Sequence, residues 1–350
     1  MKKEKTTEKI RLIRFLTLLL AGLFFGWLIY RLVAGQVKTN TTFAMDTVMR
    51  QEVYGPRAQE TIQTVEQRVR ELENEWSLYL EKSDIARLNA AAGKDFVELS
   101  NETYQLLEQA KTLSAQMPDA FALTIAPLTL AWGITTDEPR VPSQEEIGQL
   151  LPLVDDDALL LENGKAMLEK EGQAVDLGGI AKGAACDAAK AIYEQFHVNS
   201  ALLNLGGSTI YARGRKPDGT AFRIGFRDPN GEQNSALASF SIQDAAFSTS
   251  GGYERFFEQD GVRYQHILDP KTGQPVQSNI LSVGVLSESG AQADFYSTAL
   301  YVMGRDEALE AMQNGVQAIL LDESGTLYVS EAFRDSFELL VEGYQVVYVK

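Results

Sequence analysis

A glycine-rich stretch in the middle of the chain has residue types suited to binding an anion. It reads Asp176-Leu-Gly-Gly-Ile-Ala-Lys-Gly183, and its pattern predicts a turn that follows a strand and opens a helix. At such a turn the free backbone N–H groups and the helix dipole favour a pyrophosphate, and Lys182 adds a positive charge. The stretch is neither a Walker A motif nor a G-x-G-x-x-G motif, so a tight packing turn is the alternative.

A second group of residues is suited to a hard metal ion. The chain has one cysteine, Cys186, and two histidines, which argues against a zinc site. Asp294 and Thr298 are four residues apart on a predicted helix and therefore share one face. Mg²⁺ needs few protein ligands when a substrate phosphate completes its coordination, so this pair would suffice. Alternatively, Asp294 is only a charge at the start of a helix.

One histidine is a candidate general base. His266 precedes the turn Asp269-Pro-Lys-Thr-Gly273, which comes after a predicted strand, and an imidazole at a loop edge can accept a proton. A lone histidine can equally be structural. The other, His197, lies at a helix end and is interpreted as a cap.

Mixed helices and hairpins must position these residues. Apolar periodicity and capping signals predict helices from Arg57 to about Trp76, near Ser100 to Ala115, from Ser143, from the Asp176–Gly183 turn to about Phe196, from about Ala291 to Met303, and from Asp306 to Asn314. Strands are predicted at Phe43–Met49 after a polar connector, around the Asn163-Gly164 turn, and near 201–209, 222–226 and 245–248. Since these elements lack a regular βαβ rhythm, we expect one α+β unit of mixed sheets with packed helices.

The N-terminus differs from the rest of the chain. Six basic residues precede the apolar run Phe15–Tyr30, and Arg31 follows it. We interpret residues 1–37 as a cytoplasmic basic tail and a signal-anchor or transmembrane segment, with residues 38–350 as the catalytic domain. A cleaved signal peptide and a buried core helix are the alternatives. The expected location is the cell membrane, single-pass, with the catalytic domain extracytoplasmic.

Charge excludes one class of partner. Residues 1–38 carry eight Lys and Arg against two Glu, a net charge of +6. Since the whole chain carries −16, the remaining residues carry −16 − 6 = −22. A body this acidic repels phosphate backbones, and we expect no nucleic-acid partner.

Taken in order, several segments resemble the FAD:protein FMN transferases, the ApbE-type flavin transferases. The resemblance runs from Phe43 to about Gly304. The matching pieces are Met45-Asp-Thr47, Trp76-Ser-Leu-Tyr79, Ser83-Asp-Ile, Leu88-Asn89, Pro127-Leu128, Trp132-Gly133, Asp176–Gly183, Asn204–Gly207, Thr249-Ser-Gly251, His266–Pro275 and Asp294–Leu300.

This resemblance implies roles for individual residues. FAD, the substrate, would be contacted by Met45, Tyr79, Ala120, Phe121, Ala122, Asp176 and Leu268, in addition to Lys182. Mg²⁺ would be held by Asp294, Thr298 and the Gly179 carbonyl. The family often has an aspartate where Ala122 stands, and it can have a second acidic residue where Ser297 stands.

The resemblance also implies an activity. FMN would pass from FAD to a Thr or Ser hydroxyl of an exported or membrane flavoprotein with a Ser-Gly-Ala-Thr-like motif, releasing AMP, with His266 deprotonating the hydroxyl. The chain's own nearest piece, Ser289-Gly-Ala-Gln292, lacks the hydroxyl, so self-modification is not expected. Two alternatives remain: a pyrophosphatase that splits FAD into FMN and AMP, and a non-catalytic flavin-binding or storage protein.

Overall fold

A nine-stranded sheet forms the centre of the protein. The computed structural model describes residues 13–26, 35–117, 119–232 and 235–350. All neighbouring strands of this sheet are antiparallel except β15 and β17, which are parallel. In spatial order the strands are β1 (Val37–Ala44), β2 (Thr47–Tyr54), β6 (Ser200–Leu205), β7 (Thr209–Gly214), β10 (Ala245–Ser250), β13 (Ile280–Ser287), β14 (Gln317–Asp322), β15 (Thr326–Ser330) and β17 (Gln345–Val349).

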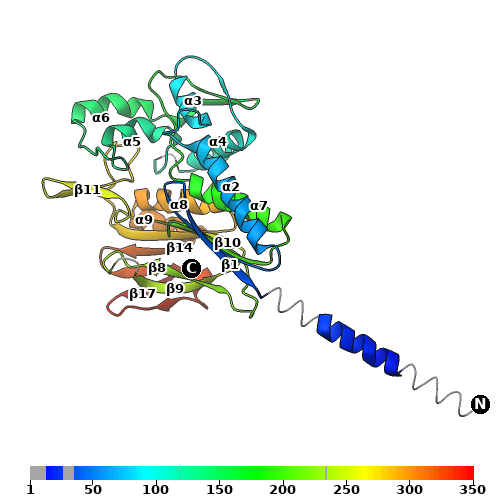
Figure 1. Ribbon diagram of the computed structural model, residues 1–350. Coiled ribbons are helices and arrows are strands. Elements are labelled where there is room, and N and C mark those ends of the chain that lie inside the picture. Colours follow the sequence, from blue (N-terminus) through cyan, green and yellow to red (C-terminus); the bar gives the residue numbers. More distant parts are fainter. Residues whose placement is uncertain (1–12, 27–34, 118, 233–234) are drawn as a thin grey trace, which may run out of the picture.

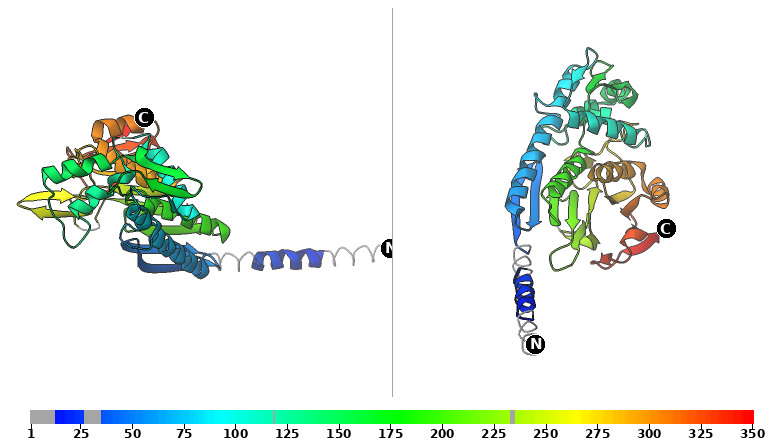
Figure 2. Two further views of the ribbon diagram at one scale, coloured as in Figure 1. Left: turned by 90° about the horizontal axis from the view of Figure 1, so that it is seen from above. Right: turned by 90° about the vertical axis from the view of Figure 1, so that its right-hand side faces the viewer.

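Four long helices pack against this sheet (Figure 1). They are α2 (Ala58–Trp76), α7 (Ala181–Gln195), α8 (Gly290–Met303) and α9 (Arg305–Gln313). α2 buries Ile62, Val65 and Val69 at helical spacing, and Figure 2 shows it alongside the β1–β2 hairpin. α8 is buried on most sides because it contacts α7 as well as β10 and β13. A second apolar cluster joins the large sheet to a three-stranded sheet of β8 (Phe222–Arg227), β9 (Ala236–Ile242) and β16 (Glu338–Leu339).

A smaller helical part lies above the sheet in Figure 1. It contains α3 (Asp84–Ala90), α4 (Asn101–Ser114), α5 (Ala126–Trp132), α6 (Gln144–Leu150) and a small sheet of β3 (Val97–Glu98), β5 (Lys165–Leu168) and β4 (Leu159–Glu162). A projecting ribbon of β11 (Phe256–Gln259) and β12 (Val262–Gln265) lies beside it. Trp132 Nε1 donates to the Gly273 carbonyl at 2.8 Å, which ties α5 to the turn that follows this ribbon. The expected α+β architecture of mixed sheets and packed helices is confirmed.

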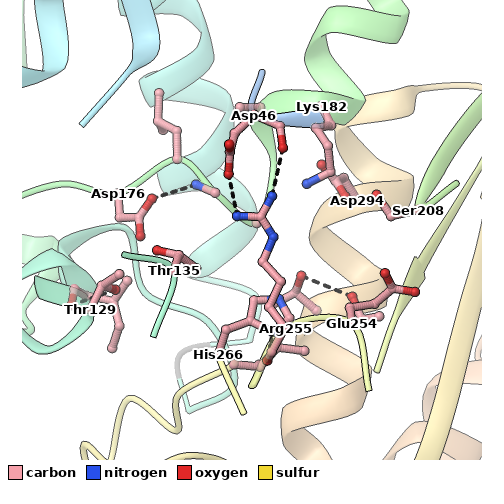
Figure 3. A pocket seen from close by; sticks show the side chains of 18 of the residues that line it. Asp46, Thr129, Thr135, Asp176, Lys182, Ser208, Glu254, Arg255, His266 and Asp294 are labelled. Atoms are coloured by element: carbon pink, nitrogen blue, oxygen red, sulfur yellow. Dashed lines mark hydrogen bonds and ion pairs between the residues drawn. The ribbon is translucent and has the colours of Figure 1, made fainter. Parts of the chain in front are cut away.

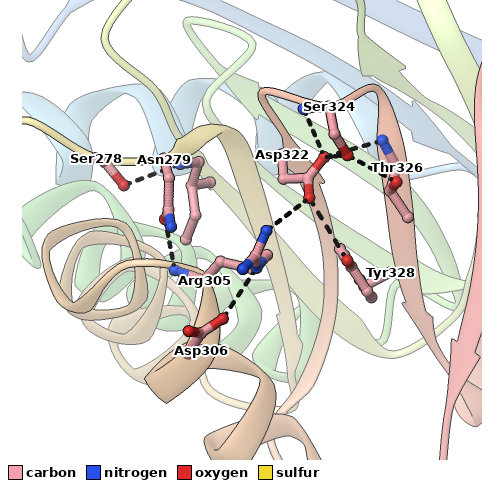
Figure 4. A network of polar contacts seen from close by, with 9 residues as sticks. Ser278, Asn279, Arg305, Asp306, Asp322, Ser324, Thr326 and Tyr328 are labelled. Atoms are coloured by element: carbon pink, nitrogen blue, oxygen red, sulfur yellow. Dashed lines mark hydrogen bonds and ion pairs between the residues drawn. The ribbon is translucent and has the colours of Figure 1, made fainter.

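A buried carboxylate joins α9 to the β14–β15 turn (Figure 4). Asp322 accepts hydrogen bonds from Ser324 and Thr326 at 2.6–3.0 Å and pairs with Arg305 at 3.4 Å. These donors hold the pKa of Asp322 below its usual value, although burial opposes the shift. The corner therefore depends on an ionised aspartate.

Two local predictions were wrong. Residues 36–49 do not form a connector and one strand; they form a hairpin whose turn, Met45-Asp46, has positive φ angles of 53° and 55°. Such turns usually contain glycine, and the absence of glycine hid the hairpin. No strand precedes Asp176 either, since this segment is irregular and is held by hydrogen bonds to Asn89 and Leu123.

At the N-terminus, residues 13–26 are helical and their apolar side chains are exposed, as at Leu18, which is 73% exposed. Across the described ranges, no helix has both the length and the apolar character needed to cross a membrane. The remainder of the predicted anchor, residues 1–12 and 27–34, lies outside the described residues.

Candidate active site

A cavity of about 380 Å³ lies where the helical part meets the large sheet. It is bounded by the β1–β2 turn, the C-terminal end of α2, the N-terminal end of α7, α8, and the loops on either side of the β11–β12 ribbon. Figure 3 shows polar side chains from these separate elements converging on it. Pockets of this size and mixed lining hold cofactor-sized ligands.

Every residue that was expected to contact FAD, to hold Mg²⁺ or to act as the base lies on this one cavity. The structure brings together Met45, Tyr79, Ala120, Phe121, Ala122, Asp176, Gly179, Lys182, His266, Leu268, Asp294 and Thr298. Their convergence follows from the fold, because they come from six separate stretches of the chain. Their individual roles remain predictions.

The glycine-rich turn lies against the N-terminus of α7. Gly178 N donates to Asp176 Oδ1 at 2.8 Å, and within the described part of the chain no acceptor is found for the backbone N–H groups of Gly179 and Lys182. Burial raises the pKa of Asp176, while the Gly178 bond and the charge of Lys182 act in the opposite direction. Two unpaired N–H groups, a helix N-terminus and a lysine make an anion-binding concavity.

Two side chains hold this turn in place. Asn89 accepts from Val175 N at 2.7 Å and donates to the Val175 carbonyl at 3.0 Å, so it replaces a missing strand partner. Asp176 N donates to the Leu123 carbonyl at 2.8 Å. Asp156 in turn accepts from the backbone N–H groups of Leu123 and Thr124 at 3.0 and 2.9 Å. The backbone around Ala120–Ala122 is thus fixed relative to Asp176.

Asp294 is a buried carboxylate, 5% exposed, on the face of α8 that also carries Thr298. It accepts from Gly183 N at 3.0 Å and from Ser248 Oγ at 2.7 Å. Throughout the described ranges it has no Lys or Arg partner within ion-pair distance. These hydrogen bonds offset part of the cost of burying the carboxylate, and its negative charge could hold a cation.

The surroundings of Asp294 suit Mg²⁺ better than a softer metal. A Cβ added at Gly179 would lie 3.4 Å from Thr298 Oγ1, so the Gly179 backbone is close to that hydroxyl. The Asp294 carboxylate, the Thr298 hydroxyl and the Gly179 carbonyl would all offer oxygen atoms as ligands, which is what Mg²⁺ prefers. Among the described residues, no cluster of three or more His, Cys, Asp and Glu side chains could hold a metal, so any ion here would need further ligands from water or substrate.

His266 is held in one tautomer. Its Nδ1 lies 3.1 Å from the Arg255 carbonyl, and because a carbonyl oxygen can only accept, Nδ1 carries the proton. Nε2 is then free to accept a proton. Burial, together with the charges of Lys182 and Arg255, lowers the pKa of His266 to about 4, so the ring is neutral at pH 7.

Several residues of the cavity were not predicted from the sequence. They include Asp46, Trp76, Thr135, Ser208, Glu254 and Arg255. Trp76 and Asp46 belong to motifs that were recognised but received no role. Arg255 had no signal in the sequence, because its contribution depends on Asp46, 209 residues away.

The sequence is similar to known proteins over most of its length. Residues 45–320 match the model of the ApbE family. A FAD:protein FMN transferase of Klebsiella pneumoniae is 33% identical over 270 residues, covering 76% of this chain and 83% of that protein. One from Treponema pallidum is 30% identical over 323 residues, covering 86% and 89%.

Solved structures show the same fold. The ApbE protein of Thermotoga maritima has a TM-score of 0.79 at 32% identity, covering 85% of this chain and 98% of that one. The Pseudomonas stutzeri flavinyl transferase ApbE has a TM-score of 0.74 at 31% identity, covering 83% and 92%. By its sequence and its fold, the chain belongs to the ApbE family.

Proposed function

We propose that this protein transfers FMN from FAD to a Thr or Ser hydroxyl of another protein and releases AMP. The observation that carries the proposal is the meeting, in one cavity, of an anion-binding helix N-terminus, a buried carboxylate without a cation and a neutral histidine. The names of the relatives support the same reaction.

The proposed step is a phosphoryl transfer. The acceptor oxygen bonds to the FMN phosphorus, the bond from that phosphorus to the bridging oxygen of the diphosphate breaks, and AMP leaves with that oxygen. His266 Nε2 takes the proton of the acceptor hydroxyl, a role that a neutral imidazole can fill at pH 7. The free N–H groups at the start of α7 and Lys182 stabilise the charge that develops on the diphosphate.

Asp294, Thr298 and the Gly179 carbonyl are the proposed ligands of Mg²⁺. When bound, the ion would neutralise negative charge on the diphosphate. The ion would also offset the free-energy cost of burying the Asp294 carboxylate. Hydrogen bonds from Gly183 N and Ser248 Oγ keep that carboxylate oriented. Asp294 thus connects the metal site to the turn that binds the anion.

The proposed acceptor is an exported or membrane flavoprotein with a Ser-Gly-Ala-Thr-like segment. The chain's own similar segment has a different use, since Ser289 is the N-cap of α8 and Gly290 N donates to Asp187. A peptide acceptor must reach His266 from solvent. The cavity that His266 lines is also lined by the exposed side chain of Tyr79, so it is open to solvent there.

We further propose that residues 1–37 anchor the protein in the cell membrane, with the catalytic domain extracytoplasmic. The support is the basic cluster followed by an apolar run, of which residues 13–26 are helical with exposed apolar side chains. Membrane fractions washed with alkaline carbonate should retain the full-length protein but release a variant lacking residues 1–36. Release of both would contradict an anchor.

The activity test uses full-length protein, FAD, Mg²⁺ and an acceptor domain with a Ser-Gly-Ala-Thr segment. The expected product is an acceptor heavier by one FMN unit, together with free AMP. An acceptor whose Thr is changed to Val is the matched control and should stay unmodified. FMN and AMP without a modified acceptor would instead support the pyrophosphatase, and bound, uncleaved FAD would support storage.

A further inference from the structure

Arg255 reaches across the cavity to the β1–β2 turn. Its Nη1 donates to Asp46 Oδ2 at 2.6 Å, and its Nη2 donates to the Asp46 carbonyl at 2.9 Å. Figure 3 shows the side chain extending from beside His266 to Asp46. Two segments far apart in the sequence are thus joined at the cavity by one arginine.

This bridge is weakly held. The Asp46 side chain is 71% exposed and the Arg255 side chain 41% exposed, and ion pairs so accessible to water contribute little to stability. Asp46 itself has a left-handed backbone with φ of 55°, which is unfavourable for a residue other than glycine. An anion with better geometry could therefore replace Asp46 as the partner of Arg255.

The cavity offers few positive groups for such an anion. Among its described lining residues the lysines and arginines are Lys182 and Arg255, whereas five residues are acidic: Asp46, Glu73, Asp176, Glu254 and Asp294. Lys182 is at the start of α7, and the Arg255 main chain carries the carbonyl that orients His266. A planar guanidinium can form two parallel hydrogen bonds with a carboxylate or a phosphate. Arg255 makes only one of its two bonds with the Asp46 carboxylate, so a phosphate could pair with it more completely.

We infer that Arg255 is a substrate-binding residue for the diphosphate of FAD, and that Asp46 is the partner it leaves when FAD binds. When the dinucleotide binds, Arg255 exchanges the Asp46 carboxylate for phosphate oxygens. This releases the β1–β2 turn from the loop before β11, so the bridge acts as a latch that the substrate opens. The inference rests on the proposed function, since it takes FAD as the ligand.

The test measures binding of FAD and of riboflavin, which has no phosphate, to full-length protein by flavin fluorescence. Arg255→Gln should weaken FAD binding roughly tenfold, as expected for a lost bond to a charged group, and leave riboflavin binding unchanged. Arg255→Lys keeps the positive charge but loses the planar guanidinium, so its affinity for FAD should lie between those of the unaltered protein and Arg255→Gln. Turnover should show a raised KM for FAD in both variants.

A double-variant cycle tests the exchange itself. Asp46→Asn should tighten FAD binding about threefold, because Arg255 no longer has to leave a partner. That gain should disappear in the Asp46→Asn/Arg255→Gln protein. An equal gain in both backgrounds would mean that Asp46 only repels phosphate, and would overturn the latch.

A matched control comes from the β11–β12 ribbon that follows Arg255. Arg263 pairs with Glu258 at 3.1 Å, is comparably exposed and does not line the cavity, so Arg263→Gln should leave FAD binding unchanged. Equal loss of FAD and riboflavin binding in Arg255→Gln would assign Arg255 to loop structure and overturn the inference. If the unaltered protein binds no FAD, the proposed function fails together with it; normal FAD binding by Arg255→Gln overturns this inference alone.

Discussion

Gly183 of α7 and Gly290 of α8 touch backbone to backbone. A Cβ on either residue would overlap the carbonyl oxygen of the other, and a Cβ on Gly183 would also lie 2.7 Å from Asp294 Cβ. Asp187, one turn further along α7, accepts from Gly290 N at 2.6 Å and from Ala291 N at 3.0 Å. This crossing sets the position of Asp294 relative to the anion-binding turn.

Gly183→Ala should therefore lower both stability and activity. Forcing the two helices apart should reduce the free energy of unfolding by about 1–3 kcal/mol, and shift Asp294 relative to Gly179. The matched control is Gly148→Ala in α6, where a Cβ meets no atom within 4 Å and removal of a helix glycine should add about 0.5–1 kcal/mol. Urea unfolding measures both values. Equal stability of the two variants would contradict the importance of the crossing.

Asp294→Asn should abolish transfer while the protein stays folded. The amide oxygen can still accept from Gly183 N or Ser248 Oγ, but its lost charge removes the proposed metal ligand. Transfer should fall about 100-fold or more, the size of effect expected when electrostatic stabilisation of a transition state is lost. Acceptor modification at increasing Mg²⁺ concentration tests this. Asp306→Asn, on the exposed surface of α9, is the control and should keep full activity.

If His266 is the base, activity should persist to an unusually acidic pH. Its pKa of about 4 keeps Nε2 unprotonated well below 6.5, the ordinary value for histidine, so kcat/KM should stay constant through pH 6.5 and fall only near pH 4. His266→Ala should slow transfer about 100-fold with FAD binding largely retained. A rate profile with acceptor peptide measures this, with His197→Gln as control. A fall centred near pH 6.5 would show that His266 is not the base in this state.

Asp322 should make stability depend on acidity. Its folded pKa is below the usual 3.8, so its contribution is complete above pH 3.8 and is lost as the pH falls through the folded value. Asp322→Asn should cost about 1–2 kcal/mol at pH 7, because Ser324 and Thr326 lose a charged acceptor, whereas Arg305 is partly hydrated and keeps Asp306. The difference between the two proteins should shrink in acid. Urea unfolding at pH 7 and at a pH below 3.8 measures the difference in free energy of unfolding between the unaltered protein and Asp322→Asn. A difference that stayed the same at both pH values would contradict this prediction.

Local signals predicted much of the helical structure. α2 was found from its apolar spacing at Ile62, Val65 and Val69, and α6 from the cap in which Ser143 accepts from Glu146 N. The β4–β5 hairpin was found because Asn163-Gly164 is a strong turn signal. Each of these signals is contained within a few residues, which is why the sequence alone reveals it.

Features that depend on distant partners could not be predicted in the same way. β1 was missed because its partner β2 follows a turn without glycine, and the order of the nine-stranded sheet has no local signature. The candidate site was assembled from ordered motifs, and the structure places its residues on one cavity. Arg255 was missed because its side chain contacts Asp46, far away in the sequence. Asn89 lay in a recognised motif but received no role, because it supports Val175 across the fold.

The central claim is that this chain moves FMN onto a protein hydroxyl, and intact mass of the acceptor tests it most directly. Full-length protein is mixed with FAD, Mg²⁺ and a Ser-Gly-Ala-Thr acceptor, with and without a chelator. We expect an acceptor heavier by one FMN unit, and this gain should disappear with chelator and with the Asp294→Asn enzyme. An unmodified acceptor in the presence of the active, FAD-bound protein would contradict it.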